Sequence, residues 1–412
     1  MRYGKSAERN YGVKAQRRKG KQGMFIYKMF RKFIFILFLQ ILISEFVCGQ
    51  VSVRIFADQK ISSAVFSITE GKYEVDVYDG KTLLLNSDET IIFAVYNGKI
   101  AVKTRNSKSF MCDSLTVKGL TGNDRFSLRI NAGSQVMKFY GGDLRCSYDL
   151  GSMVFINNCD VEQYIAGVVR TEGGPGKSIE FHKSQAVLAR TYMYKHFERH
   201  AIDGYNLCDN THCQAYNGIT DDSVINKAAL DTKDLVILDK DSTLVNSAFH
   251  SNCGGETSIS EDVWLSGHYY FRRIKDPYCI NSRNASWRKS IPYSDWVSYL
   301  KNSGYVADQK APASFNYVQA TRQNDYRVAS FSLPFTQIRN DMDLRSSFFS
   351  VFREGDSIIF DGRGYGHGVG LCQEGAMVMA GRGFKYDGII RFYYTGVIIT
   401  DIKYGKIVKN DL

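Results

Sequence analysis

The segment DVEQYIAGVVRTE, residues 160–172, is where the sequence changes from a strand pattern to a helix pattern. Asp160 with Gln163 three positions later is a capping-box arrangement, so a helix is predicted to begin here. Positions i, i+3, i+4 and i+7 of one helix face are occupied by Ile165, Val168, Val169 and Glu172. Glu172 therefore extends the apolar face of the predicted helix.

Two interpretations of Glu172 follow from this position. A carboxylate that points toward a hydrophobic interior has its charged form disfavoured, so its pKa should rise. A raised pKa is what a general acid needs near neutral pH. Alternatively, Glu172 bends out to solvent where Gly173-Gly174-Pro175 ends the helix. Helical periodicity leaves both interpretations open.

Before Asp160 the sequence has the pattern of short strands. Runs such as VSVRIFA, YEVDVY and TIIFAVY are separated by turn residues, among them the hairpin-turn pair Asn97-Gly98. We expect a β-rich accessory region at residues 50–135, in which no catalytic residue types cluster. Because helix and strand patterns mix after it, the predicted fold class is α+β.

A second helix is predicted at residues 179–197, with Ser178 as its N-cap. Long polar side chains stand among small apolar residues of this helix, at Lys183, Gln185, Arg190 and Thr191. Such a pattern is typical of a packed helix that presents polar groups to a cleft. A solvated helix face is the alternative.

The charge distribution excludes a nucleic-acid-binding face. Residues 1–32 hold eleven Lys/Arg and one acidic residue, whereas the 42 basic and 40 acidic residues from Gln50 onward nearly balance. The net charge of +11 therefore belongs to the N-terminus, and we expect no nucleic-acid partner.

The N-terminus has the features of a secretion signal. Basic residues precede the apolar run FIFILFLQILI, residues 33–43, which fits a signal-peptide core and is shorter than the ~20 residues that span a bilayer. We expect residues 1–49 to direct export to the cell envelope or beyond, with cleavage near Gly49-Gln50. The alternatives are a lipoprotein acylated at Cys48 and an uncleaved anchor, so membrane contact is expected only through this segment.

Eight cysteines follow Cys48, and export permits disulfides among them in 105 pairings. Within CDNTHCQAY, residues 208–216, two thiols and an imidazole lie close together, at Cys208, His212 and Cys213. This density of soft donors suits a structural Zn²⁺, with His196 or His200 as the fourth ligand. A Cys208–Cys213 disulfide is the alternative.

Two glycine-rich segments follow, AFHSNCGGETSISEDVW at residues 248–264 and GRGYGHGVGLCQEGA at residues 362–376. Glycine inside a strand marks a bulge or a close backbone approach, and residues two apart share a strand face. The alternation therefore predicts that Arg363, Tyr365 and His367 lie on one face. Neither a GxGxxG frame nor a Walker lysine is present, which argues against a nucleotide loop.

Four stretches together resemble the stage II sporulation protein D and LytB (SpoIID/LytB) family over about residues 136–400. They are VEQYIAGVVRTE with KSQAVLARTY, CDNTHCQAYNG, FHSNCGGETSISEDVW, and GRGYGHGVGLCQEGAMVMAGRGFKYDGIIRFYYTG. The resemblance implies a catalytic domain with an open cleft at residues 136–412, acting on peptidoglycan glycan strands. Sporulation members are lytic transglycosylases that cleave the bond from N-acetylmuramic acid to N-acetylglucosamine, prefer peptide-free strands and leave 1,6-anhydro ends.

The resemblance also assigns roles to residues. Glu172 aligns with the family's catalytic glutamate, a single general acid/base. The expected substrate-binding residues are Gln185, Arg190, Thr191, His250, Asp262, Arg363, Tyr365 and His367. Some members bind zinc through the cysteine-rich loop, which supports Cys208, His212 and Cys213 as ligands.

Two departures from the family pattern bear on the site. Members commonly have Met-Pro after the catalytic glutamate, where this chain has Gly173-Gly174, so the loop there is expected to be more flexible. Cys253 and Cys372 stand where serine is frequent, and we hypothesise a disulfide between them.

Two other functions remain open at this point. LytB-type members enhance a separate cell-wall amidase, a role that needs only glycan binding. A hydrolase would use Asp262 or Glu261 as a second carboxylate and would leave reducing ends.

Overall fold

The computed structural model describes residues 49–76, 82–87, 89–105, 109–132, 134–264, 266–306 and 314–406. The chain divides into two compact units, residues 1–49 and 50–412. The predicted signal core and Cys48 lie outside the described residues. Within the described ranges, every helix is too short or too polar to cross a membrane.

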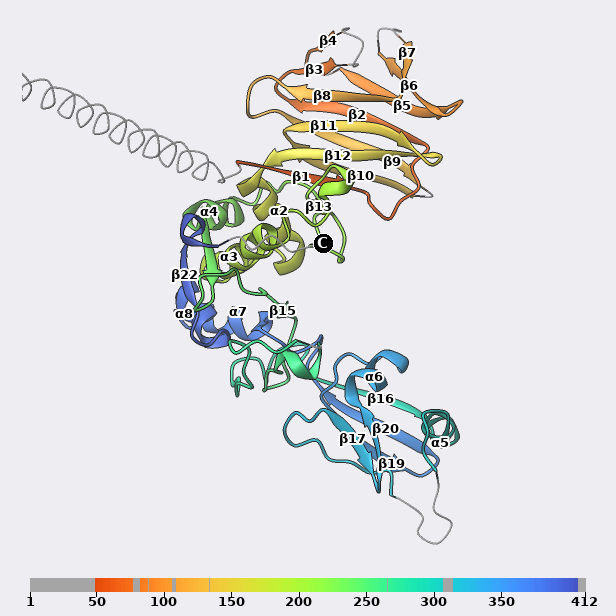
Figure 1. The fold of residues 1–412 in the computed structure, drawn as a ribbon, viewed down its shortest axis with the longest axis vertical. Coiled ribbons are helices and arrows are strands. Elements are labelled where there is room, and N and C mark those ends of the chain that lie inside the picture. Colours follow the sequence, from red (N-terminus) through yellow and green to blue (C-terminus); the bar gives the residue numbers. More distant parts are fainter. Residues whose placement is uncertain are drawn as a thin grey trace, which may run out of the picture. The chain divides into compact units, whose positions relative to one another are not determined.

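Two antiparallel sheets form the N-terminal part of the second unit, as predicted (Figure 1). The first has the order β13-β1-β12-β11-β8-β3-β4 and the second the order β10-β9-β2-β5-β6-β7. All pairs are antiparallel except β1 with β13. Their bounds are β1 Gln50–Ile55, β2 Ser63–Glu70, β3 Tyr73–Asp76, β4 Thr82–Leu85, β5 Thr90–Tyr96, β6 Lys99–Thr104, β7 Ser109–Cys112, β8 Ser114–Gly119, β9 Arg125–Ala132, β10 Ser134–Gly141, β11 Asp143–Asp149, β12 Ser152–Asp160 and β13 Leu207–Cys208.

Alternation of buried and exposed residues places one face of each sheet in a common core. In β2 the buried side chains are Ala64, Phe66 and Ile68, at every second position. Asn97 and Gly98 join β5 to β6 with φ of 47° and 73°, so both residues take the left-handed conformation that a tight hairpin turn requires.

The helices around Glu172 follow β12 directly. Helix α2, Val161–Gly173, begins where Asp160 accepts hydrogen bonds from the N–H groups of Glu162 and Gln163, and it ends at Gly174. Helix α3, Ile179–Lys195, is capped by Ser178, which accepts from the N–H of Glu180. Both predicted helices and both caps are confirmed. Helix α4, Ser223–Asp231, packs against α2 and α3.

Two further cores complete the described chain. One surrounds two short two-stranded sheets and two helices: β14 Leu235–Leu238 with β22 Ile398–Asp401, β15 Phe249–His250 with β21 Leu371–Cys372, α7 Gln373–Gly381 and α8 Tyr386–Tyr393. The other contains β16 Ser286–Pro292, α5 Tyr293–Asn302, β17 Asp325–Val328, β18 Phe331–Pro334, α6 Phe335–Asp341, β19 Phe349–Glu354 and β20 Ser357–Arg363.

The alternating glycines do not continue β20 as a regular strand. Strand β20 ends at Arg363, and every second residue from Gly364 to Gly370 has a positive φ, between 73° and 105°. A Cβ on Gly370 would lie 2.1 Å from the Ala248 carbonyl oxygen, and one on Gly364 would lie 2.6 Å from that of Asn252. The close backbone approach is confirmed, but the prediction of one shared strand face is wrong because the left-handed residues re-aim the chain at each step.

These elements confirm the α+β class with a β-rich N-terminal region. The boundary expected at 135/136 falls inside β10, which pairs with β9 along its length. The division of residues 50–412 into an accessory region and a catalytic domain stays a prediction.

Candidate functional site

Glu172 lies in the last turn of α2, where its side chain is half-buried. Its Oε1 accepts a hydrogen bond of 3.0 Å from the backbone N–H of Ala215. Burial raises the pKa of the Glu172 carboxyl above its ordinary value of 4.5, and the Ala215 bond opposes only part of this rise. The buried interpretation of Glu172 therefore agrees with the structure better than the solvated one.

The loop that carries Ala215 packs closely on α2. Gly167 faces it, and a Cβ there would lie 2.3 Å from the carbonyl oxygen of Gly218. Thr171, next to Glu172, accepts a 3.3 Å hydrogen bond from the N–H of Asn217. The position of the Glu172 carboxyl therefore depends on the conformation of residues 215–218.

Two glutamines join Glu172 from distant parts of the chain. Gln373, the first residue of α7, donates from Nε2 to the Glu172 carbonyl oxygen at 3.1 Å and to Oε1 of Gln185 at 3.2 Å. The Nε2 group of Gln185 is buried and has no partner among the described residues. It is a hydrogen-bond donor that remains available beside the glutamate.

A four-residue donor cluster precedes the Ala215 loop. His200, Cys208, His212 and Cys213 each offer a ligand atom, and these atoms lie within 4.8 Å of one another. The Sγ atom of Cys213 lies 3.5 Å from His200 Nε2 and 3.7 Å from His212 Nδ1, and the Sγ atom of Cys208 lies 3.6 Å from His212 Nδ1. Tetrahedral Zn²⁺ with ordinary bond lengths separates sulfur and nitrogen ligands by about 3.5 Å, so the donor set fits this metal.

The structure distinguishes the two histidines proposed as the fourth donor. Nδ1 of His200 lies 3.4 Å from an oxygen of Asp203, which orients the ring so that Nε2 faces the thiols. His196 lies outside the cluster, where its Nδ1 contacts Arg199 at 3.1 Å and its ring packs on Tyr192. Burial lowers the pKa of His196 to about 4.

His250 and His367 lie together on the glycine-rich segments, with ring centroids 5.5 Å apart. Nδ1 of His250 is 3.0 Å from the Val369 carbonyl oxygen, which leaves Nε2 as a buried acceptor without a partner among the described residues. His367 is held at both nitrogens by backbone, through Phe249 and Val369. Burial lowers the pKa of both imidazoles, that of His367 to about 4, so both rings are neutral at pH 7.

A partly exposed aromatic ring packs against the histidine pair. Trp264 is 38% exposed, and its ring centroid lies 5.3 Å from that of His367. Tyr365, from the same glycine-rich run, is 47% exposed. Exposed aromatic faces of this kind can stack against sugar rings.

Two predicted substrate-binding residues lie instead in the core. Arg190 has no exposed surface; its guanidinium is bonded to the Glu162 carboxylate and to the carbonyl oxygens of Ala229 and Leu235. Thr191 is equally buried and links the backbones of α3 and β14 through its hydroxyl. The prediction that these two line the cleft is wrong because all their polar groups are already satisfied inside the fold.

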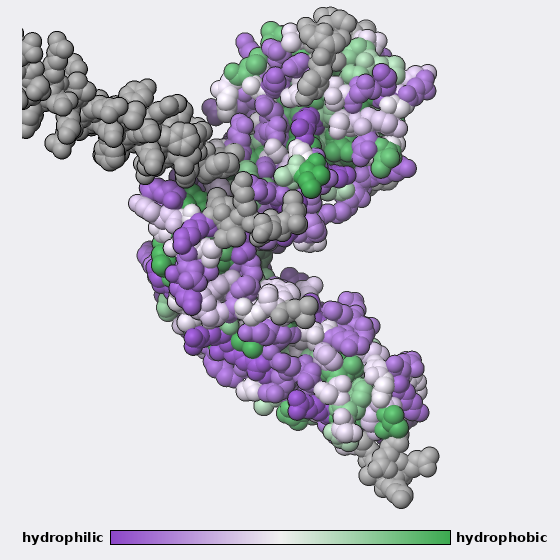
Figure 2. All heavy atoms as spheres, in the orientation of Figure 1, coloured by the Kyte–Doolittle hydropathy of each residue, from purple (hydrophilic) through white to green (hydrophobic). Residues whose placement is uncertain are grey.

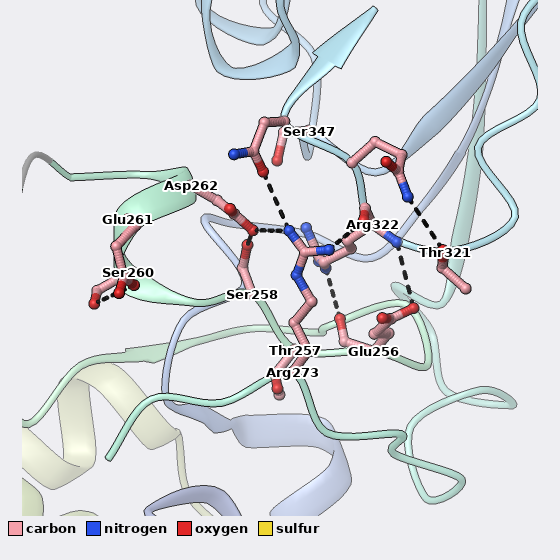
Figure 3. Close-up of polar contacts among 12 residues, drawn as sticks. Glu256, Thr257, Ser258, Ser260, Glu261, Asp262, Arg273, Thr321, Arg322 and Ser347 are labelled. Carbon is pink, nitrogen blue, oxygen red and sulfur yellow. Dashed lines mark hydrogen bonds and ion pairs between the residues drawn. The ribbon is translucent and has the colours of Figure 1, made fainter. Parts of the chain in front are cut away.

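Asp262 and Arg363 are also committed to intramolecular contacts. Figure 3 shows the Asp262 carboxylate pointing at Arg273, 2.7 Å away, with the Ser258 hydroxyl donating to the same oxygen at 3.0 Å. Arg363 donates to the Gln319 and Ala320 carbonyl oxygens and stacks on an aromatic ring. Asp262 Oδ1 is buried and has no partner among the described residues, and both Arg363 bonds use Nη2 alone, so a substrate-binding role of these two residues stays a prediction.

The hypothesised Cys253–Cys372 disulfide is absent. Both residues are free thiols, and so are Cys208 and Cys213, so the alternative disulfide in the cysteine-rich loop is not formed either. Cys253 instead contacts Cys279 and Asp276.

A polar hollow of 620 Å³ lies beside the end of α2. Its lining residues are Arg170, Thr171, Pro175, Asn217, Ile219, Thr220, Asp221 and Asp222. Arg170, Thr171 and Pro175 flank Glu172 in sequence, but the Glu172 side chain is not among the lining residues. Hydrophilic side chains predominate on the face of the molecule shown in Figure 2.

Sequence reasoning did not select Gln373 or Gln214. Gln214 lies beside Ala215, is buried, and has an Nε2 group without a partner among the described residues. Gln373 directly follows Cys372 in the glycine-rich segment at residues 362–376, and it is the first residue of α7.

Comparison with known proteins points to the same family as the sequence motifs do. A family model described as "Stage II sporulation protein" matches residues 149–238, the segment that holds Glu172 and the cysteine-rich loop. An uncharacterised protein of Brachyspira hyodysenteriae is 26% identical over 87% of this chain and 97% of its own length. Stage II sporulation protein D of Bacillus subtilis is 27% identical over 60% of this chain and 76% of its own length.

A further relative, the amidase enhancer of Bacillus subtilis, is 24% identical over 85% of this chain. The matched region covers 63% of that protein, less than two thirds of its length. The family match falls on the helices and loop that hold Glu172, and two of the relatives are named amidase enhancer and stage II sporulation protein D. These matches confirm the resemblance of the chain to the SpoIID/LytB family.

Proposed function

We propose that this protein is a peptidoglycan lytic transglycosylase of the cell envelope, with Glu172 as its general acid/base. The observation that carries the proposal is the state of the Glu172 carboxyl, which is half-buried, accepts one backbone hydrogen bond and has a raised pKa. Such a carboxyl holds a proton at higher pH than an exposed glutamate does and is able to donate it.

One carboxyl suffices for this reaction. Protonated Glu172 gives its proton to the glycosidic oxygen as the bond to C1 of the muramic acid breaks. The resulting carboxylate then takes the proton of the C6 hydroxyl while O6 of the same sugar bonds to C1, so a 1,6-anhydro end forms and no water is consumed. A hydrolase needs a second carboxylate to activate water. Asp262, which was considered for that role, is held in an ion pair with Arg273.

Three groups support this role by their position. Nε2 of Gln185 and Nε2 of His250 are buried and have no partner among the described residues, so each would gain a hydrogen bond from an acetamide or hydroxyl group of a sugar that reaches it. His250 in β15 pairs with Cys372 in β21. The next residue, Gln373, donates a hydrogen bond to the carbonyl oxygen of Glu172. The exposed Trp264 ring offers a stacking face beside them.

We further propose that Zn²⁺ binds at His200, Cys208, His212 and Cys213. All four ligands come from the protein, which is typical of a structural site and leaves no open position for a water nucleophile. Cys213 lies two residues before Ala215, whose N–H holds Glu172. Zinc bound at these four residues would therefore fix the loop whose Ala215 N–H positions the Glu172 carboxyl.

The experiment incubates the purified full chain with peptide-free glycan strands, beside Glu172→Gln and the control Glu198→Gln, an exposed glutamate. Products are weighed by mass spectrometry. Anhydromuramic ends from the wild type and the control, lost in Glu172→Gln, are the expected result. Products heavier by one water would establish hydrolysis instead, and equal cleavage by Glu172→Gln would remove this residue from the mechanism.

A second candidate is supported by the similarity to the amidase enhancer of Bacillus subtilis. In this role the chain binds glycan strands and raises the activity of a separate cell-wall amidase. No cleavage by any variant, together with faster amidase release of stem peptides in the presence of wild type and Glu172→Gln alike, would favour the enhancer.

A further inference from the structure

A second donor cluster lies under the glycine-rich segments. Cys253, Asp276, Cys279 and Cys372 are all buried, and their ligand atoms lie within 4.8 Å of one another. Cys253 Sγ is 3.3 Å from Cys279 Sγ and 3.2 Å from Asp276 Oδ2. None of these residues belongs to the His200–Cys213 cluster.

The backbone brings the four residues together from three segments. The parallel register of β15 and β21 places His250 beside Cys372, and the N–H of Cys253 donates to Cys372 Sγ at 3.3 Å. Asp276 and Cys279 are separated by two residues, a spacing that lets one short loop supply two ligands. Cys372 also caps α7, where its Sγ accepts from the N–H of Gly375 at 3.4 Å.

Asp276 is the group that most requires a cation. Its side chain is 1% exposed, and its oxygens accept hydrogen bonds from Cys253 Sγ, the Tyr393 hydroxyl and the Tyr278 N–H. No lysine, arginine or histidine of the described residues forms an ion pair with it. Burying an unpaired carboxylate is costly, and a bound cation removes that cost.

The fold also keeps space around this carboxylate. A Cβ on Gly375 would lie 2.5 Å from Asp276 Oδ2 and 2.2 Å from the Tyr393 hydroxyl, so only glycine leaves both groups in place. Arg322 is buried next to the cluster, and its Nη2 donates to the Cys253 carbonyl oxygen at 2.9 Å. Its positive charge offsets the excess negative charge of three thiolates and one carboxylate around a dication.

An odd number of thiols argues for a metal over a disulfide. Any disulfide among the three cysteines would leave the Asp276 carboxylate buried without a partner of opposite charge, and would leave one thiol unbonded. The 3.3 Å between the Sγ atoms of Cys253 and Cys279 is far from the 2.05 Å of a bonded pair and nearer to the roughly 3.8 Å between thiolates around a tetrahedral metal. Thiolate-rich sets with one oxygen donor select Zn²⁺ among the common divalent cations.

We propose that Cys253, Asp276, Cys279 and Cys372 form a second structural Zn²⁺ site. Binding releases the three thiol protons to solvent and changes no oxidation state. The site fastens β15, β21 and the 276–279 loop to the start of α7. It thereby fixes two residues next to its ligands, His250 through the β15–β21 pairing and Gln373 through the chain.

Zinc content of the full chain tests the proposal. After purification with zinc and dialysis, elemental analysis should find two zinc ions per wild-type chain, one for each donor cluster. Cys279→Ala and Cys208→Ala should each retain one ion, and the control Cys146→Ala, a buried cysteine outside both clusters, should retain two. X-ray absorption at the zinc edge should give about 2.5 sulfur ligands per metal for the wild type and about 2 for Cys279→Ala.

Two results would overturn the second site. One is a single zinc ion per wild-type chain that Cys279→Ala retains. The other is a disulfide between any two of Cys253, Cys279 and Cys372, found by non-reducing peptide mapping of the metal-loaded protein. If Cys279→Ala does not fold, the wild-type zinc content, sulfur count and peptide map still decide the question.

Discussion

The side-chain amide of Gln373 donates a 3.1 Å hydrogen bond to the backbone carbonyl oxygen of Glu172, which lies 201 positions earlier in the chain. The same amide donates to Gln185 at 3.2 Å. The carbonyl belongs to the last turn of α2, where no further helical N–H is available to satisfy it. Gln373 therefore joins the C-terminal glycine-rich segment to the helix end that carries the proposed acid.

Replacing Gln373 by alanine should reduce catalysis more than stability. The change leaves the Glu172 carbonyl and the Gln185 amide oxygen without this donor, at a cost of about 1–3 kcal/mol. Because these groups border Glu172, we expect a tenfold or greater loss of kcat/KM on glycan strands. The control Gln59→Ala, at an exposed position, should leave the rate unchanged. Wild-type kinetics in Gln373→Ala would show that the hydrogen bond has no part in positioning the acid.

Glu172→Gln should make the protein more stable at pH 7. Because the folded-state pKa of Glu172 is raised above 4.5, the ionised carboxylate opposes folding, and this cost develops as pH rises through the folded-state pKa. Glutamine is uncharged and its Oε1 can still accept from Ala215. The free energy of unfolding, measured in urea, should favour the variant at pH 7, and the difference should disappear as pH falls below 4.5.

Glu198→Gln, at an exposed position, is the control and should show no such difference. If Glu172→Gln is less stable than the wild type at pH 7, the carboxylate is stabilised by its surroundings and the acid assignment loses its physical basis.

The pH dependence of activity should have one basic limb. The reaction needs protonated Glu172, so kcat should fall about tenfold per pH unit above the pKa of this group in the substrate complex. The limb should lie above pH 4.5 because burial raises that pKa. His367, whose pKa burial lowers to about 4, should add no second limb above pH 5, and burial likewise lowers the pKa of His250. A limb that persists in Glu172→Gln would belong to another residue.

The local features of the site were predictable from sequence because they depend on neighbours in the chain. The cap at Asp160 and the break after Gly173 define α2, and helical periodicity places Glu172 on its apolar side. The density of donors in residues 208–213 likewise predicted a cluster whose members are close together in sequence.

Residues whose environment depends on distant partners were not predictable. Arg190 has the pattern of a cleft residue on α3, but Glu162, 28 positions earlier, pairs with it in the core. Gln373 and Asp276 acquire their roles only when β15 and β21 pair, a contact between segments more than one hundred residues apart. No periodicity in the sequence carries that information.

Zinc binding in the cysteine-rich loop should depend on His200 and not on His196. His200→Ala removes a donor and should lower the zinc affinity sharply, whereas His196→Ala should retain it, because His196 lies outside the cluster. Asp203→Asn, which weakens the contact that orients His200, should reduce affinity about 10- to 100-fold. Competition with a chromophoric chelator measures all three. Equal zinc loss from both histidine variants would contradict the assignment.

The buried ion pair between Arg190 and Glu162 should be the most sensitive point of the helical core. Arg190→Met alone leaves Glu162 buried without a partner and should lower the free energy of unfolding by about 3–5 kcal/mol. The double variant with Glu162→Gln should recover part of this loss, because no charge is then left unpaired. Recovery should be incomplete, since the Ala229 and Leu235 carbonyls still lack the guanidinium.

The exposed pair Arg288–Glu354 is the matched control, and Arg288→Met should cost no more than about 1 kcal/mol. Urea denaturation of the wild type, Arg190→Met, Glu162→Gln and the double variant gives the coupling between Arg190 and Glu162 directly. A cost for Arg190→Met as small as that of the control would mean that the guanidinium reaches water. In that case the original prediction of Arg190 as a cleft residue would regain support, because a solvent-accessible guanidinium at this point of α3 would be free to contact a sugar.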